Sequence, residues 1–271
     1  MTTQEAFYKS WSKKSERLIE HDIQCGVRKA QVMLGAVPCD IRGGIKTVVD
    51  VGCGYGSTLS CLAALLNVQA GLGLDYAGDA VKIASERFAT AKIRYASQTS
   101  LDIEATVAQI SQFVPLPVDM IVLADVLEHV PDPAETITML APLTRYFLVK
   151  IPIEASLLDN HFLPFKEKPG PGHSNGHLRE FTVDGAYAFI RQIGLSPISE
   201  GVYAYQIDET FPPLENPPFR RWLYSTLLKN FKRVCSWVMP KRFFLRVIGG
   251  GGVLLSCEKG GGVLMGKVRG H

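Results

Sequence analysis

The chain alternates between short apolar runs and longer stretches in which apolar residues recur every three or four positions. The short runs have the β-branched composition of buried strands, and the longer stretches have the period of amphipathic helices. From residue 45 the pattern predicts, in order, strand 45–51, helix 57–66, strand 70–75, helix 78–88, strand 93–96, helix 103–113, strand 119–124, helix 132–143 and strand 146–151. Strands separated by helices form right-handed βαβ units, so we expect a parallel sheet covered by helices on both faces.

The flanks of this alternating region follow other patterns. Apolar spacing predicts one or two helices over residues 4–36, before a break at Gly43 and Gly44. The loop 159–179 is rich in Gly, Pro and His, a composition typical of an active-site lid or rim. After it we expect helix 182–193 with Thr182 as N-cap and Gly194 just past its end, an inserted amphipathic helix at 217–239, and late strands at 196–205 and 252–257.

Composition narrows the class of protein without fixing its function. The 271 residues suffice for one large core, and 46% hydrophobic with 20% charged residues is an ordinary globular balance. A net charge of +3 is too small to indicate nucleic-acid binding. The six cysteines form no C-x-x-C pair and lack zinc-ligand spacing, which favours reduced thiols in a cytoplasmic protein. No signal peptide or membrane-spanning helix is expected.

The strongest chemical signal is the segment that joins the first predicted strand of the alternating region to its first helix. Gly52, Gly54 and Gly56 occupy alternate positions there. Glycine lets backbone N–H groups approach a ligand closely, and the following helix N-terminus favours a carboxylate. Asp75 ends the next strand, where an acid can accept hydrogen bonds from both ribose hydroxyls of a nucleoside. A glycine turn without a ligand and a dinucleotide site are the alternatives, although G-x-G-x-x-G would place a glycine at Ser57.

Three motifs in a fixed order resemble those of class I S-adenosylmethionine-dependent methyltransferases. Residues 48–56 (VVDVGCGYG) are similar to motif I of that family, and residues 71–76 (GLGLDY) to motif II. Residues 119–133 (DMIVLADVLEHVPDP) resemble its aspartate-led fourth strand followed by L-E-H-V-x-D-P. Residues 176–182 (GHLREFT) are similar to a G-H-x-x-x-F-[ST] segment. The pattern resembles most the methyltransferase 11/23-like group, which includes ubiquinone O-methyltransferases and many sugar and natural-product methyltransferases.

The resemblance implies an α/β, Rossmann-like class I methyltransferase fold, with a mostly parallel seven-stranded sheet flanked by helices. It implies one methyltransferase domain over 1–271, with an N-terminal helical cap at 1–44 and an amphipathic insertion at 207–249, for which no family counterpart is evident. The implied cofactor is S-adenosyl-L-methionine. Its methionine part lies at the glycine loop, its ribose and adenine near the end of the second strand, and its sulfonium at the turn after the fourth strand. The implied cofactor-binding residues are Asp50, Gly52, Cys53, Gly54, Gly56, Asp75, Tyr76, Gln98, Ala124 and Asp125, with Ser97 as an alternative to Gln98.

Methyl transfer requires alignment of the acceptor with the sulfonium methyl and, for a hydroxyl acceptor, removal of a proton. His129, close to the expected methyl position, is the first candidate for that base, and His177 is the second. His173 is a third, in the same loop as His177. The structural alternatives are a histidine that braces the helix beginning near Asp132 and a loop histidine bonded to backbone.

Two neighbouring carboxylates each allow two roles. Glu128 either orients a neighbour or braces the N-terminal helices, and Glu154 either contacts acceptor hydroxyls or is a solvated rim charge. Asp125 and Asp132 are too few for the clustered carboxylates of a magnesium-dependent methyltransferase, so we expect no metal.

The insertion has an unusual charge pattern. Residues 216–257 contain eight basic residues, interleaved with aromatics, and no acidic residue. On a helix, one face would hold Phe219, Leu223, Leu227, Phe231, Val234 and Val238, and another Arg221, Lys229, Lys232 and Ser236. The helix is either a cap that packs on the sheet edge with a solvated basic side, or an interfacial helix that touches anionic lipid or covers a lipid-linked acceptor. Nucleic acid is not expected, because no groove-reading motif is present.

The sequence therefore favours an S-adenosylmethionine-dependent methyltransferase, with O-methylation of a small-molecule, sugar or lipid-linked acceptor. We expect it to be cytoplasmic, with peripheral membrane contact through residues 217–247. An NAD-dependent oxidoreductase and a non-catalytic methyltransferase-like binding protein are the alternatives. Cofactor motifs alone do not distinguish O, N and C acceptors.

Overall fold

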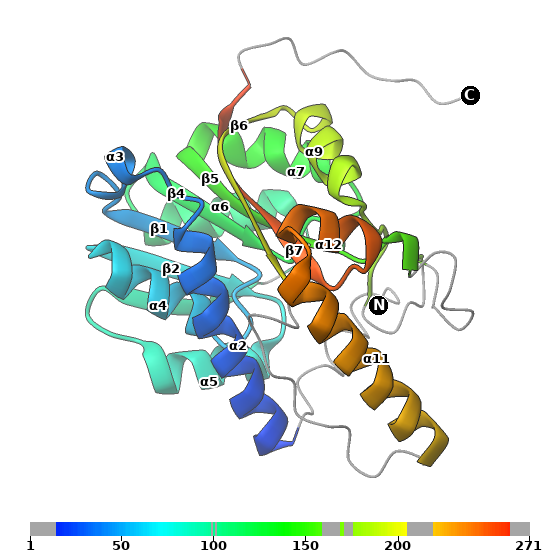
Figure 1. Ribbon diagram of the computed structural model, residues 1–271. Helices are drawn as coiled ribbons and strands as arrows, with labels where there is room; N and C mark the ends of the chain where they lie inside the picture. Colours follow the sequence, from blue (N-terminus) through cyan, green and yellow to red (C-terminus); the bar gives the residue numbers. More distant parts are fainter. Residues whose placement is uncertain are drawn as a thin grey trace.

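The computed structural model describes residues 15–98, 100, 102–158, 169–170, 176–204 and 219–260. These residues form a layered α/β fold around a seven-stranded sheet with the strand order β3-β2-β1-β4-β5-β7-β6 (Figure 1). The strands are β1 (Thr47–Val51), β2 (Ala70–Asp75), β3 (Ile93–Ser97), β4 (Val118–Ala124), β5 (Thr144–Ile153), β6 (Leu195–Ala204) and β7 (Gly251–Lys259). Strands β1 to β5 pair in parallel, and β7 is antiparallel to both β5 and β6.

The helices follow the alternation that the sequence predicts. They are α2 (Glu16–Leu34), α3 (Cys39–Arg42), α4 (Ser57–Leu66), α5 (Gly78–Phe88), α6 (Ile103–Phe113), α7 (Pro133–Leu140), the 3-10 turn η1 (Ala141–Leu143), α9 (Val183–Gln192), α11 (Phe219–Val238) and α12 (Lys241–Val247). Thr182 caps α9 by accepting a hydrogen bond from the Gly185 amide at 3.0 Å, and Gly194 follows with a φ of 86°. Both predictions for this helix are confirmed.

Alternating side chains on the strands divide the core into two layers. Val48, Met120 and Leu148 pack with α2 and α4 on one face of the sheet. Val49 and Ile121 belong to the larger cluster on the other face, which includes residues of α6, α7, α9 and α12. The predicted doubly covered parallel sheet is therefore confirmed, with β7 as its reversed strand.

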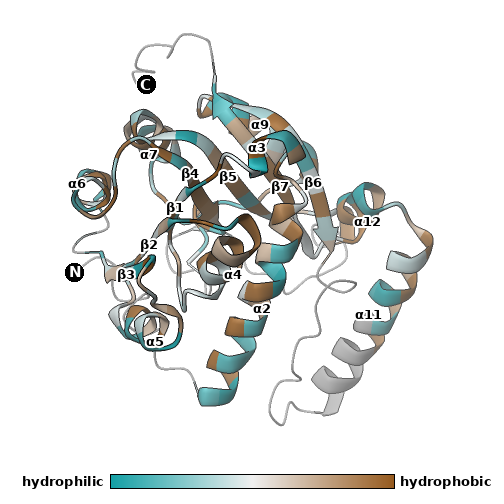
Figure 2. Ribbon diagram, turned by 90° about the vertical axis from the view of Figure 1, so that its left-hand side faces the viewer, coloured by the Kyte–Doolittle hydropathy of each residue, from teal (hydrophilic) through white to brown (hydrophobic). Residues whose placement is uncertain are grey.

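The insertion differs from the single predicted helix. Pro240, which has no N–H, separates α11 from the second helix α12, where one helix was predicted over 217–239. Phe244 and Leu245 of α12 are buried in the main core. Helix α11 extends from α12 away from the sheet in both ribbon views (Figures 1 and 2). No helix among the described residues is long and apolar enough to cross a membrane.

Candidate active site

The glycine loop lies at the carboxyl end of β1, next to the end of β2. Gly52, Gly54 and Gly56 all have positive φ values, of 78°, 52° and 80°. The amides of Gly52 and Cys53 bond to the Leu74 carbonyl at 2.7 and 3.0 Å, which holds the loop on β2. A Cβ added at Gly54 would meet nothing within 4 Å, so the loop is open at this position. At Gly56 the same addition would reach 2.6 Å from the Tyr95 ring, which only glycine avoids.

Asp75 connects this loop to the end of β2. Its Oδ2 accepts a hydrogen bond from the Gly54 amide at 2.7 Å, and its Oδ1 accepts one from the Ala77 amide at 2.8 Å. The side chain is buried, and burial raises the pKa of its carboxyl group, an effect that hydrogen bonds from the backbone amides of Ala77, Gly54 and Tyr76 oppose. The two oxygens of a carboxylate have about four lone-pair sites, so Asp75 can accept a ribose hydroxyl in addition to these amides.

Asp50, within β1, is the most unusual acid of the site. It is buried, and neither of its side-chain oxygens has a hydrogen-bond partner among the described residues. Burial raises the pKa of Asp50 to about 7, although the charge of Lys29 opposes the shift. Leaving a buried carboxyl group without partners costs free energy, and the ammonium of an amino acid would supply the missing donors.

The turn after β4 contains a partly buried network of charges. Asp125, in the left-handed region with a φ of 59°, accepts a hydrogen bond from Lys29 Nζ of α2 at 2.6 Å. It also pairs with Lys150 of β5, whose side chain is fully buried. Burial alone would raise the pKa of Asp125, but Lys150 and Lys29 hold it well below its usual range. Asp125 is therefore an anion held between two cations.

Helix α2 brings Lys29 to this network through a close contact with α4. A Cβ added at Gly26 would lie 2.0 Å from Ser57 Oγ, and Thr58 Oγ1 donates a hydrogen bond to the Gly26 carbonyl at 3.3 Å. The glycine therefore allows α2 to lie against the first turn of α4, which directly follows the glycine loop. The N-terminal helix is thus part of the site as well as a cover for the sheet.

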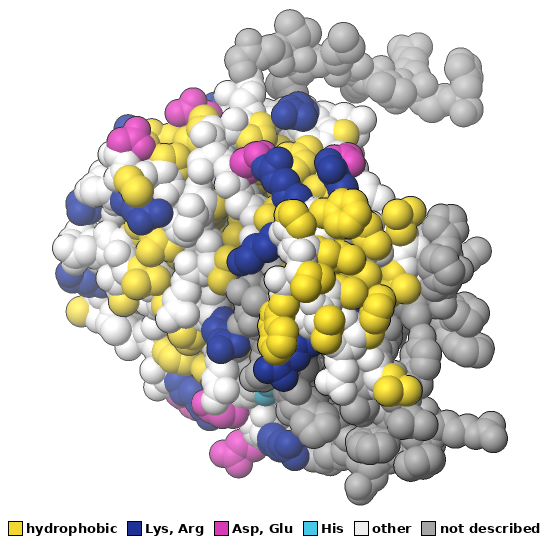
Figure 3. All heavy atoms as spheres, viewed as in Figure 1, with side chains coloured by type: hydrophobic (Ala, Val, Ile, Leu, Met, Phe, Trp, Pro, Cys, Tyr) yellow, Lys and Arg dark blue, Asp and Glu magenta, His cyan; other side chains and the backbone are white. Residues whose placement is uncertain are grey.

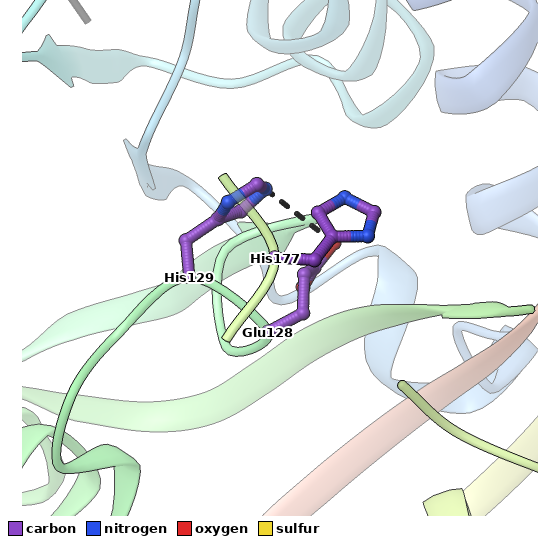
Figure 4. A group of neighbouring side chains, drawn as sticks. All are labelled: Glu128, His129 and His177. Carbon is purple, nitrogen blue, oxygen red and sulfur yellow. Dashed lines mark ion pairs between the residues drawn. The ribbon is translucent and has the colours of Figure 1, made fainter. Parts of the chain in front are cut away.

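The two candidate bases lie side by side next to a third titratable group. The rings of His129 and His177 are in edge-to-face contact, with centroids 4.8 Å apart, and Glu128 lies beside them (Figure 4). His129 Nε2 is 3.9 Å from Glu128 Oε1. Glu128 is fully buried, and burial together with the nearby Asp125 raises the pKa of its carboxyl group to about 8.

The two histidines have opposite pKa shifts. Burial, followed by the charge of His177, lowers the pKa of His129 to about 4. Burial also disfavours the charged form of His177, but its hydrogen bond to Glu154 raises its pKa above the usual value. That bond joins His177 Nδ1 to Glu154 Oε2 at 2.7 Å. His177 is therefore the stronger base, although the sequence ranked His129 first.

Arg179 fixes the geometry of this group. Its guanidinium donates hydrogen bonds to the carbonyls of Leu127, Val130 and Pro131, at 2.7, 2.5 and 3.0 Å. The Leu178 amide donates to the Glu128 carbonyl at 2.9 Å. The segment that carries His177 is thereby tied to the turn that carries Glu128 and His129.

The structure brings most of the sequence-predicted residues to the carboxyl edge of the sheet. A Cβ added at Gly52 would lie 2.6 Å from Val126 Cγ2, so the glycine loop and the turn after β4 are in contact. Ala124 is buried at the end of β4, Cys53 is buried in the loop and Tyr76 is half-buried after Asp75. The backbone N–H of Gln98 donates a hydrogen bond to the Asp75 carbonyl at 2.8 Å. The side-chain amide of Gln98 donates to Thr106 Oγ1 at 2.7 Å, so it already has a partner in the protein.

Other assignments fall outside this group. His173 lies outside the described residues. Asp132 accepts a hydrogen bond from the Glu135 amide at 2.9 Å and caps α7. Lys29, Lys150 and Arg179 were not predicted, because a lysine or arginine in the sequence carries no sign of the distant group that it contacts.

The site fits S-adenosylmethionine on its own observed geometry. The two unpartnered oxygens of Asp50 match an ammonium, and the open position at Gly54 leaves room beside it. Asp75 presents a buried carboxylate, a group that can accept hydrogen bonds from ribose hydroxyls. These three features are those that the methionine and nucleoside parts of the cofactor require.

The binding of S-adenosylhomocysteine is expected to tighten as the pH rises from about 5.5 to about 7 and then to level off. Below a pH of about 7 the carboxyl group of Asp50 is protonated in the free protein, and a bound ammonium must displace that proton. The dissociation constant therefore falls by at most about tenfold per pH unit in this window. Calorimetric titrations at several pH values test this, and Asp50→Asn should flatten the dependence. An equally steep dependence in that variant would contradict the assignment.

Comparison with known sequences gives a partial match to one family. Residues 49–145 match a family described as a methyltransferase domain. A ubiquinone biosynthesis O-methyltransferase of Albidiferax ferrireducens is 33% identical over 107 residues. The aligned part is 40% of this chain and 39% of that protein, so the chain spans about two fifths of the length of this curated relative.

Solved structures extend the similarity over most of the chain. A chain from the Haloferax volcanii complex between the Trm112 methyltransferase activator and a methyltransferase has a TM-score of 0.59 and 18% identity, covering 93% of this chain and 97% of its own length. The plantazolicin methyltransferase BpumL, solved with S-adenosylhomocysteine, has a TM-score of 0.51 and 13% identity, covering 95% of both chains. At such identities the similarity establishes the fold, and the predicted Rossmann-like architecture is confirmed.

Proposed function

We propose that this chain is a class I S-adenosylmethionine-dependent methyltransferase that methylates a hydroxyl oxygen of a small-molecule, sugar or lipid-linked acceptor. The observation that supports this most is the contact between two loops at one edge of the sheet. One loop presents an open glycine turn beside the carboxyl groups of Asp50 and Asp75. The other carries His129, which lies against His177. The proposal treats residues 1–271 as a single domain, with a cap at 1–44 and an insertion at 207–249.

The proposed reaction needs little covalent chemistry from the protein. When bound, the cofactor supplies a methyl group on a positively charged sulfur, a good leaving group. The acceptor oxygen forms a bond to the methyl carbon as the sulfur–carbon bond breaks, and the hydroxyl proton moves to an imidazole nitrogen. His177 is suited to take that proton, because Glu154 stabilises its charged form. His129 is neutral at pH 7 and orients the acceptor beside it.

Replacing His177 with alanine is expected to reduce methyl transfer by roughly 10²- to 10⁴-fold, the usual contribution of a general base. Its affinity for S-adenosylhomocysteine should change little, because no predicted cofactor contact is removed. The test measures transfer from methyl-labelled S-adenosylmethionine to a panel of phenols, sugars and lipid-linked acceptors, with calorimetry for cofactor binding. His21→Ala, on α2, is the matched control. Full activity in the His177 variant would contradict the proposed role, and cofactor binding without product from any acceptor would favour a non-catalytic protein.

We also propose that the chain is cytoplasmic and that α11 contacts an anionic membrane surface, which would bring the site close to a lipid-linked acceptor. Four residues of the predicted apolar face are exposed to solvent: Leu227, Phe231, Val234 and Val238, the last by 74%. Trp237, which was not assigned to that face, is also exposed, by 72%. The opposite face, with Lys232 and Ser236, is buried. This is the reverse of a helix that caps the sheet with its apolar side, so the capping role suits α12 alone.

Charge favours lipid over a second protein as the partner of this face. Hydrophobic side chains gather over α11 and α12 in Figure 3, with Lys and Arg side chains along their border. The exposed Arg233 and Lys241 lie in a segment that contains no acidic residue from 216 to 257, whereas Arg242 of that segment is paired with Glu200 of β6. Insertion of an apolar face flanked by basic residues into an anionic interface is the usual mode of peripheral membrane helices.

The double change Trp237→Glu and Val238→Glu is expected to reduce binding to phosphatidylglycerol vesicles by at least about tenfold. Each buried apolar side chain contributes about 1.5–3 kcal/mol, and about 1.4 kcal/mol corresponds to tenfold in affinity. Vesicle co-sedimentation measures the bound fraction, with Leu65→Glu as the control, since Leu65 is an exposed apolar residue of α4. Equal vesicle binding by both variants would contradict the proposal, as would self-association of the native chain without vesicle binding.

A further inference from the structure

Glu128, His129 and His177 form a group whose chemistry extends beyond proton transfer. Each offers one ligand atom, and these atoms lie within 4.8 Å of one another. Two of the residues come from the turn after β4, and the third comes from the segment that precedes α9 (Figure 4). Donors of a tetrahedral zinc site are about 3.4 Å apart, given bond lengths of about 2.0–2.1 Å to nitrogen and oxygen. Shifts of roughly 1 Å in the positions of the ligand atoms would therefore allow all three side chains to bind one cation.

Both imidazoles are oriented by oxygen acceptors on the same ring nitrogen. His129 Nδ1 faces the Gly176 carbonyl at 3.1 Å, and His177 Nδ1 faces Glu154 Oε2 at 2.7 Å. These contacts favour the tautomer with the proton on Nδ1, which places the basic lone pair on Nε2. Metal-binding histidines in proteins are held in this way, by a backbone carbonyl or a carboxylate on the other ring nitrogen.

Glu128 supplies an independent reason to expect a cation. Its side chain is fully buried, and neither carboxylate oxygen accepts a hydrogen bond from the described residues. Buried polar atoms nearly always have partners, and one that lacks them calls for an explanation such as a bound ion. A divalent cation beside His129 would give both oxygens a partner.

The donor set selects the kind of cation. Two imidazole nitrogens and one carboxylate oxygen suit first-row transition ions such as Zn²⁺, whereas Mg²⁺ and Ca²⁺ prefer oxygen ligands throughout. Three protein ligands also leave at least one coordination position open, as in catalytic rather than structural zinc sites. The hydrogen bonds from Arg179 hold the turn that carries two of the ligands, so the group is already organised.

We propose that Glu128, His129 and His177 bind a divalent transition-metal ion of the Zn²⁺ type, with the acceptor oxygen at its open position. The catalytic part of this inference rests on the proposed function. The metal would lower the pKa of the coordinated hydroxyl, which would release its proton to water. The oxygen would then form its bond to the methyl carbon as the sulfur–carbon bond breaks. In the metal-free chain His177 takes the hydroxyl proton, as proposed above; with the metal bound, His177 is a ligand and water takes the proton.

Titration of the metal-free protein with Co²⁺, in the absence of cofactor and acceptor, tests the site itself. The native chain is expected to develop visible absorption bands that saturate at one ion per chain, and Zn²⁺ but not Mg²⁺ should displace them. Glu128→Gln, which is close to isosteric, and His129→Ala should each weaken Co²⁺ binding by at least about tenfold, the usual loss for a disturbed metal site. His21→Ala serves as the control for Co²⁺ binding elsewhere on the chain. His21 Nε2 and Cys25 Sγ on α2 lie 3.5 Å apart and are a second pair of atoms able to bind a metal ion.

The outcomes separate this inference from the proposed function. The absence of Co²⁺ absorption bands in the native chain would overturn the metal site. So would bands that persist in the Glu128→Gln and His129→Ala variants but disappear in the His21→Ala variant. Binding of S-adenosylhomocysteine by each variant shows that it is folded. Saturable Co²⁺ binding in a protein that does not bind S-adenosylhomocysteine would uphold the metal site and refute the methyltransferase assignment.

Discussion

Replacing Asp75 with alanine is expected to abolish measurable binding of S-adenosylhomocysteine. The change removes the carboxylate proposed to accept both ribose hydroxyls, and hydrogen bonds to charged groups contribute about 1.5–3 kcal/mol each. Losing two of them weakens binding by roughly 10²- to 10⁴-fold. The change also frees the Gly54 amide, which Asp75 Oδ2 holds at 2.7 Å, so the glycine loop loses an anchor.

Calorimetric titration measures the loss, and circular dichroism of the variant shows that the fold persists. Asp79→Ala is the matched control, because Asp79 is an exposed acid four residues further along, in the first turn of α5. The control should bind like the native chain. An unchanged affinity in the Asp75 variant would show that the ribose lies elsewhere.

Replacing Asp125 with asparagine is expected to lower the free energy of unfolding by about 3–5 kcal/mol, the usual cost of breaking a buried ion pair. Lys150 is fully buried and pairs with Asp125, so the substitution leaves its charge without that partner in the core. Asparagine tolerates the left-handed backbone at this position, where φ is 59°, so backbone strain does not contribute.

Urea unfolding of a double-mutant cycle tests this explanation. Lys150→Met removes the buried charge, and the double variant Asp125→Asn with Lys150→Met is expected to recover most of the lost stability. Lys29→Met serves as the comparison, because Lys29 is 22% exposed and should be less costly to replace. If the losses of the two single variants simply add in the double variant, the ion pair is not the source of the effect.

The order of strands and helices was predictable because local signals mark their ends. Helix α4 begins after Gly56 and α9 begins after the Thr182 cap, and both starts lie where the sequence predicts. Helix α11 ends at Val238, one residue before the predicted end, whereas the second helix α12, which begins after Pro240, was not predicted. The antiparallel strand β7 also follows from its apolar run, although its direction depends on the long connection before it.

The site was predictable only where residue type and position in a motif determine the chemistry. The glycine loop and Asp75 belong to that class, since positive φ and a strand-end acid leave a pattern in the sequence. The ion pair between Lys29 and Asp125 joins residues 96 positions apart, and no local pattern relates them. The apolar face of α11 was identified correctly, but periodicity does not tell which side of a helix faces the protein.

The central claim is that the site formed by the glycine loop, Asp50 and Asp75 binds an S-adenosyl nucleoside. Calorimetric titration of the native chain with S-adenosylhomocysteine, alongside NADH, tests it most directly. We predict saturable binding of one S-adenosylhomocysteine per chain and no binding of NADH. Binding of NADH without S-adenosylhomocysteine, or of neither, would contradict the account.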